Sequence, residues 1–237
     1  MFLEYTQDEG GVAAHSGSAF HTLVEAWHQS NHDADHAIRI EQSRRHEWPQ
    51  ADIAKSVMPA FEGYIADPRN KLTPLASELE IKFEIDPSPD DPTQDLIYLM
   101  GHIDQVRADE NGQPRIWDMK LSRKGGGELI NSYAYQIVMY AVGATKYLGR
   151  EFLPGGIIRC STYSTKEAKK FASPDGVFFP VTASQQVMDH MVRDFARVVA
   201  AVRRGDVSAR PGDWCSWCPI GHISRCVPLL ERSTKSL

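Results

Sequence analysis

Two aspartates and a lysine lie close together in the middle of the chain. Asp104 follows an apolar stretch that starts at Leu96, and Asp118 and Lys120 lie on the apolar stretch that returns after a turn rich in Asp, Asn, Gly and Pro. Carboxylates on two neighbouring strands form a hard-oxygen site suited to Mg²⁺ or Mn²⁺, which take one or two protein carboxylates plus substrate phosphate oxygens. Such an ion can polarise a phosphodiester and lower the pKa of a bound water.

Lys120 is well placed to work beside such an ion. Alternate residues of a strand share a face, so Asp118 and Lys120 point to one side, and Trp117 and Met119 point to the other. The lysine could orient the attacking water, offset charge on the phosphate, or accept the water's proton if burial depresses the lysine pKa. Asp-x-Lys is also a common surface salt bridge. The spacing alone therefore does not distinguish a catalytic pair from a salt bridge, and the surrounding elements have to be considered.

Those elements alternate between helical and extended patterns. Apolar periodicity predicts helices over residues 16–29, 50–66, 133–148 and 183–204, with partial helix in 31–49. It predicts strands over 78–85, 155–163 and 177–181, and a β-hairpin whose centre is 101–120. This order predicts an α/β sandwich with a mixed central sheet. The triplet Gly125–Gly127 lacks the lysine and hydroxyl of a phosphate-binding Walker loop.

Composition narrows the class of protein. A chain of 237 residues with 42% hydrophobic and 24% charged residues is expected to be globular. Because there is neither a long apolar run nor a secretion signal at its start, we expect a cytoplasmic protein without a membrane span, in a bacterial or phage-infected cell. A net charge of −5 argues against general coating of nucleic acid but allows local DNA binding. Arg123 and Lys124, which adjoin the hairpin, are candidate DNA contacts.

Four motifs, taken in order, resemble those of a known family. Gly17–His21 resembles a helix motif that ends in a metal-binding histidine, and Gly101–Asp104 resembles a Gly-x-x-Asp strand. Asp118–Lys120 resembles an Asp-x-Lys strand, and Gln136–Tyr140 follows the helical pattern Gln-x-x-x-Tyr. In this order the motifs are similar to the PD-(D/E)xK nuclease superfamily, and specifically to its RecB-like exonuclease branch, which includes CRISPR-associated RecB-like nucleases and many phage exonucleases.

The resemblance implies a fold, an activity and a role for each matching position. The fold would be a restriction-endonuclease-like sandwich. The activity would be that of a Mg²⁺- or Mn²⁺-dependent exonuclease that acts on linear or single-stranded DNA. Its setting would be recombination, repair or phage DNA processing, where it could have protein partners. Lys120 would position the water, and Gln136 and Tyr140 would line the catalytic site. The implied metal ligands are His21, Asp104, Asp118 and the main-chain carbonyl of Met119.

Several of these residues also have simpler interpretations. His21 could be a helix histidine tucked beside Phe20 and Trp27, and Tyr140 could be a core residue, as we expect of Tyr133 and Tyr135. Two further carboxylates could support the site without binding the ion: Glu80 on the strand before the hairpin, and Glu25 one turn after His21.

The end of the chain carries a second candidate metal site. We expect residues 1–205 to form the nuclease domain and 206–237 a small appendage packed on it, whose candidate ligands are Cys215, Cys218, His222 and Cys226. Three cysteines and a histidine could hold a structural Zn²⁺. Alternatively, three cysteines with His15 or another group could hold a [4Fe–4S] cluster, or the thiols could be free.

The resembled branch commonly joins three C-terminal cysteines to a fourth that precedes the helix motif. This chain departs from that pattern, because no cysteine precedes His21. Cys160 lies within a predicted strand, so we expect a buried core thiol there.

Two other classes of function remain open on sequence alone. One is a catalytically silent RecB-like module that binds DNA or protein, and the other is a zinc-binding interaction domain that does not contact nucleic acid. The intact set of Asp104, Asp118 and Lys120 argues against the silent module, because an acidic cluster without metal repels phosphate. The interaction domain would leave the hairpin unexplained.

Overall fold

The computed structural model describes residues 11–85, 97–122, 126–160 and 178–203. The chain divides into two compact units. One comprises Gly10–Ile85 and Leu96–Val192 and contains the sheet described below. Of the other unit the structure describes only residues 193–203, which form the end of helix α6 (Gln185–Arg203). The expected appendage, 206–237, lies outside the described residues.

A five-stranded mixed sheet forms the centre of the larger unit. Its spatial order follows the chain, β1 to β5; β3 and β4 run parallel, and the other neighbouring pairs are antiparallel. The predicted mixed central sheet is therefore confirmed. The strands are β1 (Ala76–Ile85), β2 (Ile97–Ala108), β3 (Pro114–Leu121), β4 (Leu153–Cys160) and β5 (Phe178–Pro180).

The turn between β2 and β3 is held by its own side chains. The backbone N–H groups of Asn111 and Gln113 both donate to Oδ1 of Asp109. Gly112 adopts a left-handed conformation with φ 78°. Glycine takes this conformation without a Cβ clash, and aspartate readily accepts from its own turn. The predicted hairpin is thus closed locally, by residues that the sequence places in the turn.

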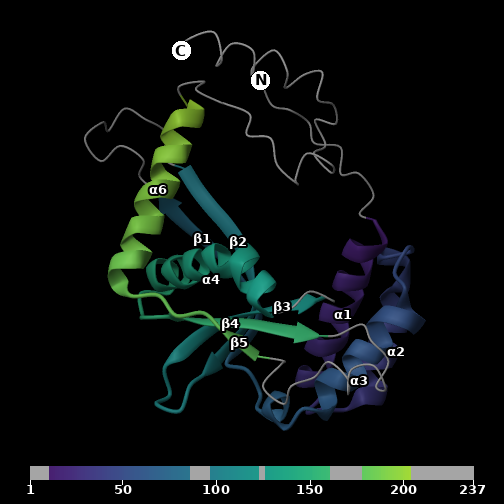
Figure 1. Cartoon of the computed structure of the whole chain (residues 1–237). Coiled ribbons are helices and arrows are strands. Elements are labelled where there is room, and N and C mark those ends of the chain that lie inside the picture. Colours follow the sequence, from purple (N-terminus) through teal and green to yellow (C-terminus); the bar gives the residue numbers. More distant parts are fainter. Residues whose placement is uncertain (1–10, 86–96, 123–125, 161–177, 204–237) are drawn as a thin grey trace, which may run out of the picture. The chain divides into compact units, whose positions relative to one another are not determined.

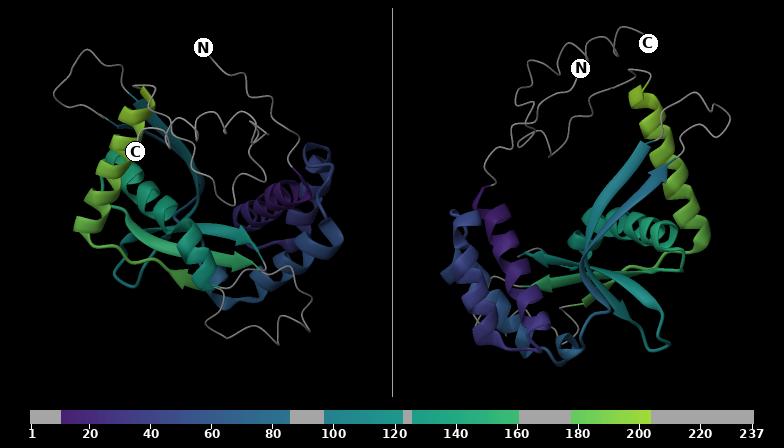
Figure 2. Two further views of the ribbon diagram at one scale, coloured as in Figure 1. Left: turned by 45° about the horizontal axis from the view of Figure 1, so that its top comes forward. Right: turned by 180° about the vertical axis from the view of Figure 1, so that it is seen from behind.

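Helix α4 (Gly126–Leu148) covers one face of the sheet (Figures 1 and 2). Leu129, Ile137 and Val138 are buried in one cluster with Ile157 of β4. A Cβ added to Gly143 would lie 2.5 Å from the ring of Phe83 on β1, so this glycine permits close packing of helix and strand. The helix begins before the predicted Tyr133, because Leu129 and Ile130 extend its apolar face into the core.

Three other helices pack against the opposite face. Their buried cluster includes Phe20, Leu23 and Phe61 and takes in Met119 and Ile158 from the strands. Asp33 caps the second helix by accepting from the N–H of His36. The helices are α1 (Val12–Gln29), α2 (Ala34–Arg44) and α3 (Met58–Ala66), with short helical turns η1 (Arg45–Glu47), η2 (Ile53–Val57) and η3 (Pro68–Lys71) between them and β1.

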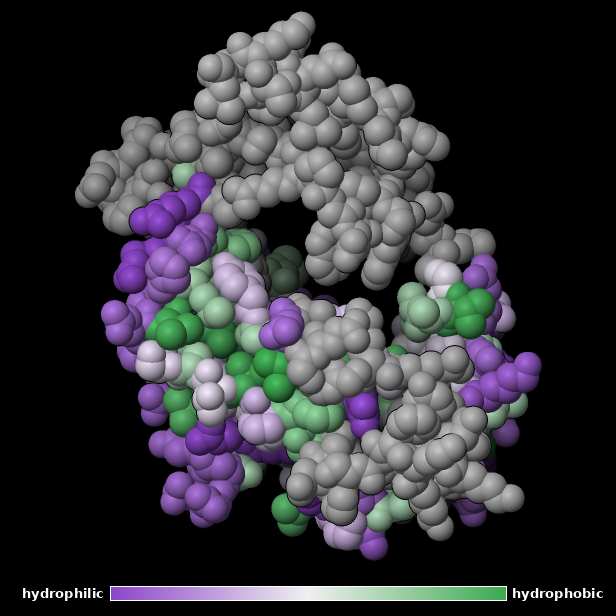
Figure 3. Space-filling model, in the orientation of Figure 1, coloured by the Kyte–Doolittle hydropathy of each residue, from purple (hydrophilic) through white to green (hydrophobic). Residues whose placement is uncertain are grey.

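Helices on both faces of a mixed sheet make an α/β sandwich of the restriction-endonuclease-like type, as expected. The strand predicted over 155–163 is β4, and its last three expected residues lie outside the described chain. At the start of α6, Met188 and Met191 pack beside α4. Over the first half of α6, Figure 3 shows hydrophilic residues and, next to them towards α4, hydrophobic residues.

Candidate active site

Asp104 and Asp118 lie side by side where strands β2 and β3 separate. The β2–β3 pairing ends at Gln105 and Trp117, and beyond it Oδ2 of Asp104 accepts the N–H of Met119 at 2.6 Å. Asp104 is 8% exposed and Asp118 only 2%. Burial raises the pKa of Asp104 to about 6, with a further contribution from the charge of Asp118. Burial also raises the pKa of Asp118, against the opposing effect of Lys120.

Lys120 points to the same side of β3 as Asp118, as the strand alternation predicts. Its Nζ lies 2.9 Å from Oδ1 and 2.8 Å from Oδ2 of Asp118, and 4.7 Å from the ring centre of Tyr133. Burial lowers the lysine pKa, but the charge of Asp118 and the hydrogen bond to it outweigh burial and raise that pKa. In the metal-free protein Lys120 is therefore an ammonium ion, which does not support the alternative in which it accepts the water's proton.

Helix α4 places Gln136 and Tyr140 over the aspartates. Nε2 of Gln136 donates to the hydroxyl of Tyr140 at 3.0 Å and approaches Oδ1 of Asp118 at 3.4 Å. A Cβ on Gly101 would lie 2.6 Å from the Tyr140 ring. The glycine of the Gly-x-x-Asp motif therefore leaves the space that the tyrosine occupies.

His21 approaches the two aspartates from helix α1, which packs on the face of the sheet opposite α4. Its Nε2 lies 3.3 Å from the carbonyl oxygen of Met119, and its Nδ1 lies 3.7 Å from Oδ1 of Asp104. Burial disfavours the protonated imidazole, but the hydrogen bond to Glu78 and the charges of Asp104 and Glu78 outweigh burial and raise the His21 pKa to about 9. In the metal-free protein this histidine is a cation surrounded by carboxylates.

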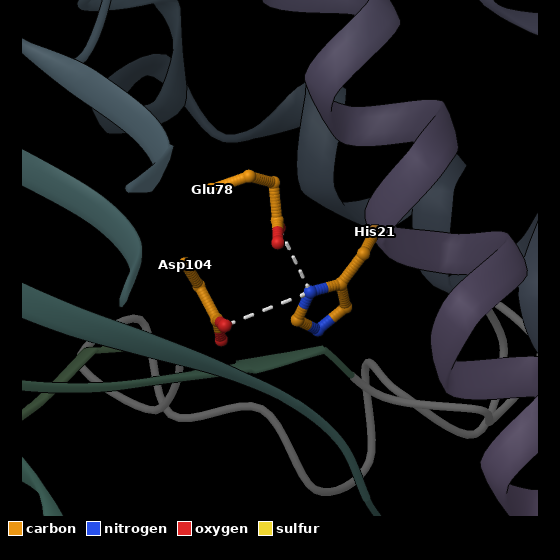
Figure 4. A group of neighbouring side chains, drawn as sticks. All are labelled: His21, Glu78 and Asp104. Atoms are coloured by element: carbon orange, nitrogen blue, oxygen red, sulfur yellow. Dashed lines mark hydrogen bonds and ion pairs between the residues drawn. The ribbon is translucent and has the colours of Figure 1, made fainter. Parts of the chain in front are cut away.

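Glu78 completes the cluster, and sequence reasoning missed it. Its Oε1 lies 3.1 Å from Nδ1 of His21 (Figure 4). His21, Glu78 and Asp104 form a group whose ligand atoms all lie within 4.8 Å of one another, so the three could hold a metal ion. The carboxylate expected from the same strand is Glu80, but Glu80 is exposed and pairs with His102 in the ladder. We call His21, Glu78, Asp104, Asp118 and Lys120 the carboxylate site.

A cleft of about 640 Å³ opens beside His21 and Glu78. It runs along α1, past Gly17 and Ser18, towards the end of α2. Glu25 lines this cleft and accepts a hydrogen bond from Gln29, one turn further along α1. The remaining lining residues are Thr22, Arg44, Glu47 and Trp48.

Other predicted residues lie elsewhere or outside the described chain. Cys160 is a buried thiol without a disulfide, as expected, and burial raises its pKa. Tyr133 packs beside the core, as expected. The expectation was wrong for Tyr135, which is exposed and donates from its hydroxyl to the carbonyl of Met191. The residues that lie outside the described chain are Arg123, Lys124, Cys215, Cys218, His222 and Cys226.

Comparison with known proteins adds one finding. The family model described as the PD-(D/E)XK nuclease superfamily matches residues 3–225, which includes every residue of the carboxylate site. No curated protein matches the chain. In the described part of the chain, none of the helices combines the length and the apolar character that crossing a bilayer requires.

Proposed function

This chain belongs to the PD-(D/E)XK nuclease superfamily, and from that membership and the geometry of the site we propose that it is a divalent-metal-dependent deoxyribonuclease. The observation that carries the proposal is the convergence of His21, Asp104, Asp118 and Lys120, which come from α1, β2 and β3. A surface salt bridge between Asp118 and Lys120 would need neither the histidine nor the second carboxylate.

The ligands fit Mg²⁺ or Mn²⁺. Carboxylate and carbonyl oxygens suit these hard cations, and imidazole is acceptable to Mn²⁺. We assign His21, Asp104, Asp118 and the Met119 carbonyl as the ligands. Two ligand atoms of one octahedral ion are about 3 Å apart, and Nε2 of His21 lies 3.3 Å from the Met119 oxygen. The bound ion supplies positive charge to the phosphate and acidifies water.

The protein's own groups would position the reactants. The N–H of Met119 donates to Asp104, which fixes the peptide group between Asp118 and Met119 and so restrains β3 next to the Met119 carbonyl. Gln136 restrains Asp118 and the Tyr140 hydroxyl. Lys120 keeps its proton at Nζ, so we assign it the roles of orienting the attacking water and offsetting charge on the phosphate.

We further propose the RecB-like branch and an exonuclease acting on linear ends or single strands. The support is the order of the motifs and the way they pack: the histidine on α1, the two acidic strands and the Gln-x-x-x-Tyr face of α4 meet at one place. In this proposal Arg123 and Lys124 contact DNA, the setting is recombination, repair or phage DNA processing, and the protein is cytoplasmic.

We make a separate proposal for residues 206–237. We assign them as an appendage on a nuclease domain of residues 1–205, with Cys215, Cys218, His222 and Cys226 as ligands of a structural metal. Metal analysis and a visible spectrum of anaerobically purified protein test this assignment. Stoichiometric zinc in a colourless protein supports the site with His222, whereas iron with the broad absorption of an iron–sulfur cluster overturns it.

The nuclease proposal is tested with linear single-stranded, linear double-stranded and covalently closed circular DNA, each with Mg²⁺, with Mn²⁺ and with EDTA. Wild type is compared with Asp118→Asn, which keeps the shape of the side chain. We expect metal-dependent loss of linear DNA by the wild type alone. Undiminished loss in the variant, or no loss in either protein, would overturn the nuclease assignment, and cleavage of the circle would overturn the exonuclease assignment.

A further inference from the structure

Glu78 has an unusual backbone for a residue inside a strand. Its φ is 49°, in the left-handed region, whereas its neighbours pair regularly with β2, Ser77 with Gln105 and Leu79 with Ile103. Among the described non-glycine residues only Asn31 and His32, in the loop after α1, share a positive φ. A side chain with a Cβ adopts this conformation at a cost in stability, and such residues cluster at functional sites.

The unusual backbone accompanies a specific contact. The Glu78 carboxylate lies against Nδ1 of His21 at 3.1 Å, on the side of the ring away from Nε2, which lies 3.3 Å from the Met119 carbonyl. Figure 4 shows the two side chains meeting from β1 and α1, with Asp104 beside them. The imidazole is thus held at both nitrogens by groups from two different strands.

We propose that Glu78 is a positioning residue for His21 in the metal site. By accepting the Nδ1–H of His21 it orients the ring so that Nε2 faces the Met119 carbonyl, where the ion would bind in place of the Nε2 proton. Metal-bound histidines commonly donate their other N–H to a carboxylate in this way. This inference rests on the proposed function, because it assumes the ion that His21, Asp104 and Asp118 would hold.

The geometry favours this role over direct coordination by Glu78. Its side chain is 30% exposed, whereas those of Asp104 and Asp118 are 10% and 2% exposed. An ion held between Glu78 and Nδ1 would also turn the Nε2 proton towards the Met119 carbonyl and remove that carbonyl from the ligands. An ion at Nε2 uses the carbonyl and keeps the hydrogen bond to Glu78.

The test is Mn²⁺ binding without DNA, measured by the paramagnetic resonance signal of free Mn²⁺. Glu78→Gln keeps an acceptor oxygen for Nδ1–H but removes the charge, and Glu78→Ala removes both. We expect Glu78→Ala to weaken Mn²⁺ binding about 10–100-fold and Glu78→Gln to stay within about threefold of wild type. Glu80→Ala, a change at an exposed position on the same strand, is the matched control and should bind as wild type does.

A further variant separates positioning from misfolding. Glu78→Gly removes the acceptor together with the left-handed strain, so we expect it to unfold at a denaturant concentration no lower than wild type and still to bind Mn²⁺ about as weakly as Glu78→Ala. If Glu78→Gln binds as weakly as Glu78→Ala, Glu78 is a ligand and the positioning role is wrong. Unchanged binding in Glu78→Ala and Glu78→Gly also contradicts it. No Mn²⁺ binding by wild type would instead overturn the proposed function itself.

Discussion

Strand β2 carries two buried polar clusters on neighbouring residues, and they are built in opposite ways. One is the carboxylate site around Asp104. The other is the arginine network of Tyr64, Asn70, Gln105 and Arg107. Asp104 and Arg107 are equally buried, 8% and 9% exposed, so burial alone does not separate a site that does chemistry from one that supports the fold.

The arginine network satisfies its charge with neutral acceptors. Arg107 donates to the Gln105 amide oxygen at 2.7 Å, to the Arg69 carbonyl at 3.0 Å, to the Tyr64 hydroxyl at 2.9 Å and to Asn70 at 3.0 Å. Because Arg69 and Asn70 lie on η3 and Tyr64 lies on α3, these hydrogen bonds connect η3 and α3 to β2. Groups of this kind stabilise a fold because each would be costly to leave unpaired.

The carboxylate site instead gathers ionisable groups of both signs, with the cations His21 and Lys120 beside the buried aspartates. The Asp104 and Asp118 pKa values are both raised, and the His21 pKa is raised by the acids around it. Perturbed groups of this kind mark functional sites when geometry agrees. Burial shifts pKa values in both clusters, because it also lowers the pKa of Arg107. The clusters differ in the partners of their charges: Arg107 donates to neutral acceptors, whereas Asp118 is paired with the ammonium group of Lys120. Substitutions in each cluster test that distinction.

The largest effect should come from Asp118→Asn. We expect activity on linear DNA to fall about 10²–10³-fold or more, because the variant loses an anionic ligand and the partner of Lys120. In EDTA the free energy of unfolding should equal or exceed that of wild type, because the raised pKa means that the fold disfavours the ionised carboxylate. DNA digestion and urea denaturation measure the two. A marked loss of stability would assign Asp118 to the fold instead.

Arg107→Met should behave in the opposite way. It leaves several buried acceptors unpaired, so we expect the free energy of unfolding to fall by about 3 kcal/mol, while Mn²⁺ affinity per folded molecule stays within about twofold of wild type. Arg39→Met, at a side chain 64% exposed, is the control and should change stability little. Loss of Mn²⁺ affinity in a folded Arg107→Met protein would show that the two clusters are coupled.

The stability of the metal-free protein should depend on pH through His21. The His21 pKa is raised from 6.5 to about 9, so its contribution is complete below pH 6.5 and is lost as the pH rises through 9. We expect a loss of about 2–3 kcal/mol in the free energy of unfolding across this window. The raised pKa of Asp104 acts in the same direction between 3.8 and about 6.

Urea denaturation in EDTA at a series of pH values measures this effect. His21→Gln should flatten the curve between pH 6.5 and 9, whereas His46→Gln, at an exposed position, should leave it unchanged. A wild-type curve that is already flat would contradict the charged state of His21 described above.

The smallest effect should come from Gln136→Ala. Its contact with Asp118 is long, 3.4 Å, and its bond to Tyr140 is an ordinary one of 3.0 Å. We therefore expect DNA digestion to slow about three- to tenfold, which corresponds to about 1 kcal/mol, with Mn²⁺ affinity nearly unchanged. Gln185→Ala on α6 removes a comparable side chain away from the site and serves as control. A loss as large as that of Asp118→Asn would make Gln136 an essential member of the site.

Much of the fold could be predicted because its signals are local. The alternation in β1 to β3, the turn residues from Asp109 to Gly112 and the helical periodicity of α1 and α4 each depend on neighbours in the chain. The same locality placed Asp104, Asp118 and Lys120 in one hairpin. Where a prediction was wrong, as at the start of α4, packing of Leu129 in the core extends the helix to Gly126, before the predicted start at Tyr133.

The sequence by itself determined the acidic hairpin, and a resemblance of motifs suggested that His21 and Gln136 join it. Only the tertiary structure decided that they do, because His21 lies 98 residues from Met119 along the chain and meets it through packing of α1 on the sheet. It also decided the place of Glu78, whose left-handed backbone takes it out of the regular ladder in which Glu80 pairs with His102. Local pattern can state which residues share a strand, but long-range packing and backbone strain decide which of them meet.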